Sequence, residues 1–399
     1  YNITRRHNMA EVKRLHDEKK IKMFRHQIVS FLGDVGPGSK DSLTVGGMPN
    51  PIVGCLCKRV VGVFKMAYNL FKHKALWQSE KVFKPVIEAE IVHEDGRPKK
   101  FHELGRDLDG NLVCSCCVTV TDLGNTRSMA FVNEVAENER HHFIEAPHRK
   151  ILNRDAEVSA ELPMRASACI PIAFSPAYYP EHDPACLQTP LSDGGAVSNL
   201  SAQLLRAKYD KGKAPVRFVI SCNEFEYKRD TAYNHGVAPT TPTSSWFEFL
   251  NAVFAVIIED GMADDVDIFL KAKGDMEHIF VTKVGEITKY PTLDSPFLKE
   301  TPSQINFFAL DRHTSTQMFE FGRHLATHKL INKIKPSEVK RAKKNGVTLA
   351  LSGGGALYPV LFGVVFAMWE HFEVKAIAGT SAGAITASYM AEKIARQED

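Results

Sequence analysis

Residues 347–383, VTLALSGGGALYPVLFGVVFAMWEHFEVKAIAGTSAG, contain two successive strand–turn–helix units. The first begins with the apolar strand 347–351, which leads through three glycines into an apolar helix. The second begins with the strand 372–378, followed by a sharp turn and a further helical pattern. Similar apolar runs at 112–120 and 215–222 are typical of strands covered on both faces. The sequence therefore predicts an α/β fold.

Shorter patterns predict the other elements. We expect β segments at 86–94 (VIEAEIVHE) and 128–135 (SMAFVNEV). Helical patterns lie at 199–210, 246–272 and 314–334. Strands that alternate with helices favour a sheet with helices on both sides.

The composition is that of an ordinary soluble enzyme, with 44% hydrophobic and 24% charged residues in a chain of 399. This length allows one large domain or two ordinary ones. The formal net charge of +3 indicates little about partners. The eight cysteines lack the usual C-x₂-C spacing of zinc sites, so we favour free thiols in a reducing compartment and leave disulfides open. We expect no metal and no cofactor.

Two N-terminal segments concentrate positive charge. Residues 1–26 carry eight Lys/Arg against three acids, and residues 51–77 carry five Lys/Arg and no acid. On a helix, 51–77 is either an interfacial segment or a core helix with snorkelling lysines. The chain opens with polar and basic residues and lacks an uncharged apolar stretch of about 18 residues. We therefore expect a cytoplasmic protein with peripheral membrane contact.

The sequence G-T-S-A-G at 379–383 lies between a predicted strand and a predicted helix. This is the context in which G-x-S-x-G forms a nucleophile elbow. Gly379 and Gly383 flank the serine because the turn is tight and its backbone approaches neighbouring elements. The N-terminal amides of the following helix favour an oxyanion. The sequence thus predicts Ser381 as a nucleophile.

Three successive glycines, Gly353, Gly354 and Gly355, follow the strand at 347–351. Such a turn exposes backbone amides to an anion, as a phosphate site or an oxyanion hole. It lacks the spacing of a dinucleotide loop and the lysine of a phosphate loop. A purely structural turn is the alternative, but the nearby serine elbow favours an oxyanion hole.

A third motif, D-G-G at 193–195, follows a proline-containing segment. Alone, this triplet is more often a simple turn. A carboxylate beside two glycines has little steric cover, however, so Asp193 can reach a neighbouring hydroxyl.

Together the three motifs resemble the signatures of the patatin-like phospholipases: a G-G-G-x-[RK]-G loop, a G-x-S-x-G elbow and a D-G-[GA] motif. The stretches ASACIPIAFSPAYYP at 166–180 and VTVTDLGNTRSMAFVN at 118–133 are similar to further parts of that family. The resemblance covers roughly 105–222 and 345–395.

The resemblance implies a three-layer α/β/α sandwich with a mostly parallel central sheet. It also implies hydrolysis of fatty-acyl esters in phospholipid or neutral lipid by a Ser–Asp dyad without histidine. By motif match, Ser381 is the nucleophile, Asp193 is the base, and Gly353, Gly354 and Gly355 line the oxyanion hole.

The chain departs from the family pattern in two ways. Leu357 and Tyr358 replace the basic residue and the glycine of the loop, so oxyanion stabilisation would depend on backbone amides alone. The order of motifs also differs, because Asp193 precedes the glycine loop and the serine. We therefore expect a circular permutant in which residue 399 once led into residue 1.

The hypothesis of a circular permutation predicts a domain organisation. Residues 1–104 form a helical lid or interfacial region, and 105–399 form the catalytic core. The core comprises an Asp half at 105–334, a connection at 335–346 and the glycine loop with the serine elbow at 347–399.

The sequence is also compatible with other functions. A Ser-His-Asp triad is the mechanistic alternative, with His182 the histidine nearest to Asp193 in sequence. A catalytically weak lipid-binding or scaffold protein is the alternative of a different class. Nucleic-acid binding is disfavoured, because no recognised module accompanies the basic N-terminus. The expected partners are a membrane or lipid-droplet surface and a lipid substrate, and a protein activator is left open.

Overall fold

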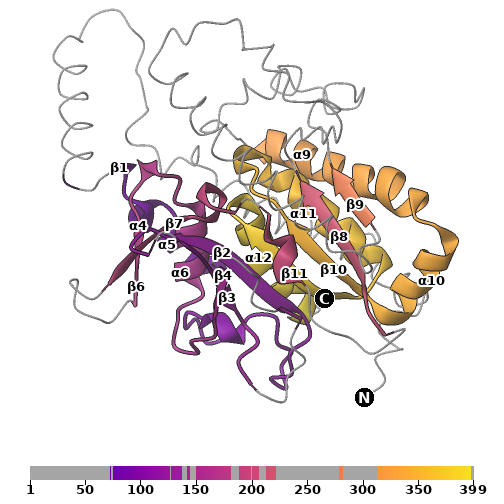
Figure 1. The fold of residues 1–399 in the computed structure, drawn as a ribbon, viewed down its shortest axis with the longest axis horizontal. Coiled ribbons are helices and arrows are strands. Elements are labelled where there is room, and N and C mark those ends of the chain that lie inside the picture. The colour runs from indigo at the N-terminus through magenta and orange to yellow at the C-terminus, as the bar shows by residue number, and fades with distance from the viewer. Residues whose placement is uncertain are drawn as a thin grey trace, which may run out of the picture.

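The computed structural model describes part of the chain in detail (Figure 1). The described residues are 72, 75–125, 127–136, 142–143, 150–180, 188–198, 200–205, 213–221, 278–281 and 312–396.

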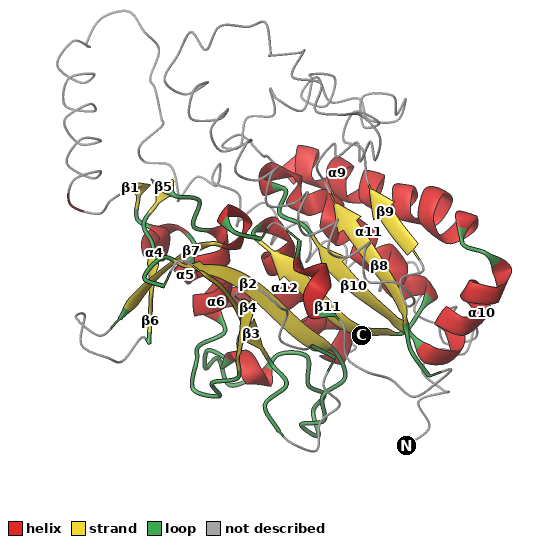
Figure 2. Cartoon of the chain, viewed as in Figure 1, coloured by secondary structure: helices red, strands yellow, loops and turns green. Residues whose placement is uncertain are grey.

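A nine-stranded sheet forms the centre of this part (Figure 2). Seven strands follow the order β4-β3-β2-β11-β10-β8-β9, β7 also pairs with β2, and β6 pairs with β7. The five strands from β2 to β9 in this order are parallel, whereas β3 and β7 run antiparallel to β2. The strands are β2 Ser115–Asp122, β3 Arg127–Val132, β4 Lys150–Asn153, β6 Ala177–Tyr179, β7 Thr189–Asp193, β8 Val216–Ser221, β9 His278–Val281, β10 Val347–Leu351 and β11 Val374–Thr380.

The prediction of an α/β fold with a mostly parallel sheet is confirmed. The strands predicted at 112–120, 128–135, 215–222, 347–351 and 372–378 correspond to β2, β3, β8, β10 and β11. All eight residues of β2 are buried, as expected of a strand covered on both faces.

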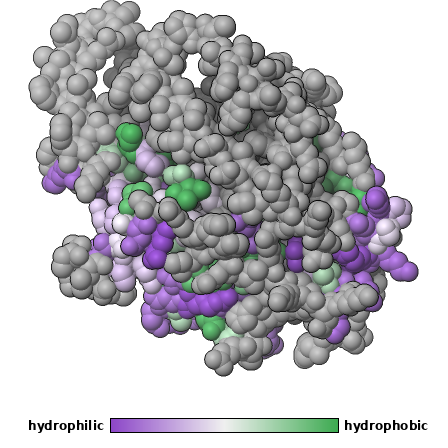
Figure 3. Space-filling view, in the orientation of Figure 1, coloured by the Kyte–Doolittle hydropathy of each residue, from purple (hydrophilic) through white to green (hydrophobic). Residues whose placement is uncertain are grey.

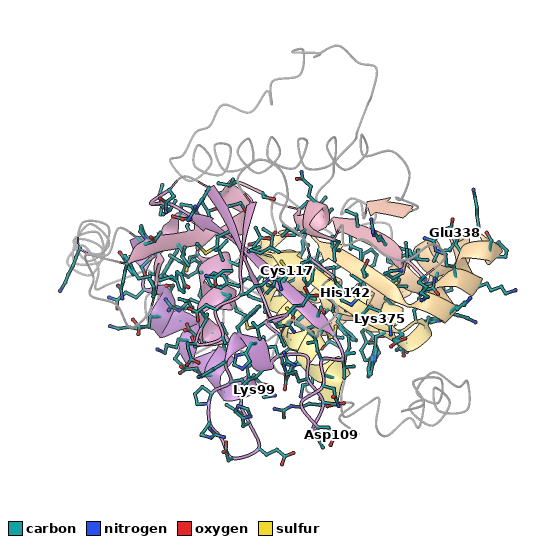
Figure 4. All side chains as sticks on the ribbon, turned by 60° about the horizontal axis from the view of Figure 1, so that its bottom comes forward. Lys99, Asp109, Cys117, His142, Glu338 and Lys375 are labelled. Atoms are coloured by element: carbon teal, nitrogen blue, oxygen red, sulfur yellow. The ribbon has the colours of Figure 1, made fainter. Side chains whose placement is uncertain are left out.

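Helices pack on one face of the sheet. The described α-helices are α4 Ser79–Val82, α5 Lys84–Glu90, α6 Glu161–Ala168, α9 Arg312–Leu325, α10 Pro336–Asn345, α11 Tyr358–His371 and α12 Ala382–Arg396. Val118, Leu349 and Ile377 share a core with α5, α6, α9, α11 and α12. The second apolar cluster combines small sheet residues such as Cys117 (Figure 4) with Phe143 and contains no residue of the α-helices named above. A second helical layer is thus not seen in the described ranges and stays a prediction.

The β segment predicted at 86–94 is wrong, because Lys84–Glu90 forms helix α5. Phe83, Ile87 and Ile91 are buried and recur every four residues, which places them on one helical face. Pro85 lies in the first turn, where its missing N–H costs no intrahelical hydrogen bond. The helical period therefore prevails over the apparent alternation of the same residues.

Residues 75–104 pack against the predicted catalytic core. Ala75–Trp77 forms strand β1, parallel to β5 (Ile172–Phe174), so the helix predicted over 51–77 does not include its last three residues. Further along the same segment, the buried Lys99 (Figure 4) makes an ion pair with Glu392 of α12. The described part of the predicted lid region is thus joined to the helix that follows Ser381.

The connection predicted at 335–346 is mainly helix α10. Its start and end follow local rules, with Pro336 in the first turn and Gly346 after the last turn at φ +81°. Ala342 is buried, whereas Lys340 and Lys344 are exposed. Figure 3 accordingly shows a hydrophilic surface at the right-hand edge, where Figure 1 places α10.

The remaining predicted helices have different outcomes. The pattern at 314–334 is confirmed in α9, which continues into a π-helical turn, Ala326–Leu330, and a 3₁₀ turn, Ile331–Lys333. Of 199–210, the structure describes a 3₁₀ turn at Ser201–Leu204. The helix predicted at 246–272 and nearly all of the basic segments lie outside the described residues. In the part of the chain that is described, no helix has the length and hydrophobicity to cross a membrane.

Helices α9 and α11 cross with their backbones in contact. A Cβ atom at Gly363 would lie 2.0 Å from the carbonyl oxygen of Phe319, and one at Gly322 would lie 2.1 Å from that of Val360. Each glycine therefore admits the backbone of the other helix. Any side chain at either position would force the helices apart.

Gly363→Ala is therefore expected to lower the free energy of unfolding by about 1–3 kcal/mol. Gly322→Ala should have a similar effect, measured by urea denaturation. Because either change separates the same two helices, the double variant should lose less than the sum of the single losses. Unchanged stability of both single variants would show that the helices do not meet at these glycines.

Candidate active site

Two strands end against each other along one edge of β2. The register pairs Thr380, the last residue of β11, with Thr119 of β2. It pairs Asp193, the last residue of β7, with the next residue, Val120. Since β11 runs parallel and β7 antiparallel to β2, their carboxyl ends point toward each other. This topology brings Ser381, the residue after β11, to Asp193.

Ser381 and Asp193 are joined by a hydrogen bond. The Ser381 hydroxyl donates to Asp193 Oδ2 over 2.7 Å. Both residues are nearly enclosed, with exposed fractions of 8% and 6%. A hydroxyl bonded to a buried carboxylate is an arrangement that can generate a nucleophile.

The backbone of Ser381 has φ +53°, in the left-handed region that side-chain-bearing residues seldom adopt. The residues on either side of this sharp turn pack closely against neighbouring backbone. A Cβ at Gly379 would lie 2.0 Å from the Gly383 carbonyl oxygen, and one at Gly383 would lie 2.7 Å from that of Ser352. Gly379 and Gly383 are thus required by backbone contacts, as the tight-turn interpretation predicts, and the turn is followed by helix α12.

Three further hydrogen bonds hold Asp193. Its Oδ1 accepts from the Gly195 amide at 2.7 Å, and its own amide donates to the Cys169 carbonyl at 3.0 Å. Its carbonyl accepts from Thr121 Oγ1 at 2.7 Å. A Cβ at Gly194 would lie 2.2 Å from the Thr119 carbonyl oxygen, so the D-G-G turn packs directly on β2.

Burial raises the pKa of Asp193 from its usual value of 3.8 to about 6. Desolvation is the largest cause, and the hydrogen bonds from Ser381 and the Gly195 amide act in the opposite direction. The carboxyl group is therefore a stronger base than an exposed aspartate and is still mostly ionised at pH 7.

The glycine loop begins beside the serine elbow. Leu351 of β10 pairs with Gly379 of β11, so Gly353 and Ser381 each follow a paired position by two residues. Gly355 has φ +49° and opens a 3₁₀ turn, Gly355–Leu357, that contacts α12. Gly353, Gly354 and Gly355 thus lie at the same end of the sheet as Ser381.

The positions where the loop lacks a basic residue and a glycine are occupied by buried side chains. Leu357 has an exposed fraction of 9% and Tyr358 one of 5%, and both belong to the main core. The loop therefore has no cationic side chain at these positions, and the amides of Leu357 and Tyr358 donate to the Gly354 and Gly355 carbonyls within the 3₁₀ turn.

Histidine and metal ligands are not assembled around Ser381 in the described residues. The Ser381 hydroxyl bonds to Asp193, and His182 lies outside the described ranges. Over the same part of the chain, no group of three or more His, Cys, Asp or Glu side chains could hold a metal ion. The four described cysteines, Cys114, Cys116, Cys117 and Cys169, are buried and form no disulfide.

Sequence reasoning did not single out Ser167. Its hydroxyl accepts a hydrogen bond from the Ser381 amide at 2.8 Å and donates to the Thr119 carbonyl at 2.6 Å. The one available signal was its place in the stretch 166–180. A buried serine among small residues otherwise resembles ordinary core.

Comparison of the chain with protein-family models, with curated proteins and with solved structures finds no significant match.

Proposed function

We propose that this chain is a serine acyl hydrolase that cleaves fatty-acyl esters of phospholipid or neutral lipid through a Ser381–Asp193 dyad. The observation that carries the proposal is the 2.7 Å hydrogen bond between Ser381 Oγ and the buried Asp193 carboxylate, at a left-handed turn between strand and helix. The resemblance of the motifs to patatin-like phospholipases supports lipid as the substrate. A circularly permuted patatin-like sandwich, located in the cytoplasm and peripherally bound to membrane or lipid droplet, belongs to the same proposal.

The reaction proceeds in two steps. Asp193 takes the Ser381 proton as Oγ attacks the ester carbonyl, and the tetrahedral intermediate then expels the alcohol, which receives that proton from Asp193. An acyl-serine remains. In the second step Asp193 takes a proton from the attacking water, the fatty acid leaves, and Ser381 recovers its hydrogen.

Backbone amides supply the oxyanion hole in this mechanism. The Ser381 amide is engaged by the Ser167 hydroxyl, so it does not serve as a donor. The candidate donors are the Ala382 amide, in the first turn of α12, and the amides of Gly353, Gly354 and Gly355. The α12 helix dipole adds positive potential at this end of the helix. Removing one such donor typically costs about 3 kcal/mol of transition-state stabilisation.

Two assays test the proposal. Fatty-acid release is measured from mixed phospholipid vesicles and from triacylglycerol emulsions, and covalent labelling by a fluorophosphonate is mapped by peptide mass spectrometry. Release together with a label on Ser381 supports the proposal, and the preferred lipid separates phospholipase from neutral lipase. Absence of both contradicts it and favours the lipid-binding or scaffold function. Because labelling needs no lipid surface, it also separates an inactive site from a missing activator.

The rate of acylation should rise with pH through about 6. Asp193 accepts a proton only when ionised, and its pKa is raised to about 6. We expect about a tenfold gain per pH unit below 5 and a plateau above 7. The measurement is the fluorophosphonate labelling rate between pH 4.5 and 8, with unfolding followed at each pH as the control. A rate that stays constant from pH 5 to 7 in folded protein would contradict Asp193 as the base.

A further inference from the structure

The last turn of α6 contacts the backbone of both dyad residues. Ser167, fully buried in this turn, places its hydroxyl 2.8 Å from the Ser381 amide nitrogen and donates to the Thr119 carbonyl of β2. The carbonyl of Cys169, just after α6, accepts a hydrogen bond from the Asp193 amide. Ser192 Oγ bonds to the same carbonyl at 2.8 Å. A single turn is thus hydrogen-bonded to the nucleophile and to the base.

The bond from the Ser381 amide has two consequences for the elbow. The first amides of a helix lack intrahelical acceptors, and Ser167 supplies one for the residue that precedes α12. A left-handed conformation at a serine also costs free energy, so the surrounding contacts must maintain it. The Ser167 hydroxyl is fixed in turn because its proton is directed at Thr119, whose partner in the sheet is Thr380.

We propose that Ser167 is a positioning residue of the dyad, which holds the Ser381 backbone in the conformation that directs Oγ at Asp193. The inference rests on the proposed function, since it assigns Ser167 to the acylation step. Ser167 does not touch the substrate. Its effect therefore falls on the rate of attack and not on substrate binding.

The first test is the kinetics of Ser167→Ala. This change leaves the Ser381 amide and the Thr119 carbonyl without the Ser167 hydroxyl. With a soluble p-nitrophenyl ester we expect kcat and the fluorophosphonate labelling rate to fall by about 10–100-fold, with KM within about twofold of wild type. A mainly structural role would instead lower the fraction of folded enzyme and leave the labelling rate of the folded fraction unchanged, which would overturn the inference.

Ser388→Ala is the matched control. Ser388 is also fully buried and lies on α12, but its hydroxyl contacts the Cys116 sulfur at 3.7 Å, away from the elbow. We expect its kcat and labelling rate to stay within about twofold of wild type. Equal losses in Ser388→Ala and Ser167→Ala would overturn the assignment. If Ser167→Ala does not fold, Ser167→Cys, which keeps a weak donor in place of the hydroxyl, is tested against the same limits.

A second measurement does not depend on catalysis. Hydrogen–deuterium exchange is compared for the peptide 379–385 in wild type and Ser167→Ala, with a β10 peptide as the internal reference. Faster exchange confined to 379–385 supports positioning of the elbow, and unchanged exchange overturns it. Wild type that is neither labelled nor active refutes the proposed function, whereas equal labelling of wild type and Ser167→Ala refutes the role of Ser167 alone.

Discussion

Ser381→Ala is expected to lower fatty-acid release by about 10⁵-fold or more, because removal of an attacking serine from a comparable catalytic unit costs up to about 2 × 10⁶ in kcat. Fluorophosphonate labelling should disappear entirely. The Ser381 hydroxyl, at 2.7 Å from the Asp193 carboxylate, is the proposed nucleophile. Alanine, like serine, has a Cβ atom and would adopt φ +53° at the same cost. The variant therefore removes the oxygen without relieving or adding backbone strain.

The control for this variant is another buried serine close to the site. Ser352 follows β10, and its hydroxyl bonds to the neighbouring Gly353 carbonyl at 2.7 Å. Ser352→Ala should still be labelled on Ser381. Any change in its labelling rate would measure how far the Ser352 hydroxyl helps to hold the glycine loop. Release that survives Ser381→Ala would show that a different group attacks the ester, and the dyad would have to be abandoned.

The sequence predicted strands β2, β3, β8, β10 and β11, the elbow and the glycine-rich turn because each depends on local pattern. An apolar run followed by glycines and a helical pattern fits few structures other than a strand, a tight turn and a helix. The carboxyl ends of adjacent parallel strands lie at one edge of a sheet. β10 and β11 are such neighbours, so the loop after Leu351 and the turn after Thr380 meet. These elements needed no knowledge of distant contacts.

The pairing of Ser381 with Asp193 could not be derived in the same way. The two residues are 188 positions apart, and D-G-G by itself indicates only a turn. The resemblance to a family suggested the pair, and the shared edge of β2 supplies its structural basis. Ser167 lies in the family-like stretch 166–180, but its role could not be read from that stretch, because it depends on two backbone groups from other elements. Likewise, α5 was mistaken for a strand because its residues fit two periods.

The proposed base also carries a cost in stability that follows from its burial. The pKa of Asp193 is about 6 in the folded protein, above its usual 3.8, so the folded state binds this proton more tightly than the unfolded state. The resulting stabilisation is fully present below pH 3.8 and is lost as pH rises through 6. At pH 7 the raised pKa of Asp193 therefore lowers the free energy of unfolding by roughly 3 kcal/mol.

Asp193→Asn is therefore expected to lower activity by about 10⁴-fold while raising stability at pH 7 by about 1–3 kcal/mol. The amide keeps the shape of the side chain but cannot take the Ser381 proton, and it is neutral at every pH. Urea denaturation of both proteins at pH 4 and pH 7 measures the second effect. The gain should be largest at pH 7 and nearly vanish at pH 4, where Asp193 is itself protonated. An equal gain at both pH values, or a loss at pH 7, would show that the buried charge of Asp193 is not what limits stability there.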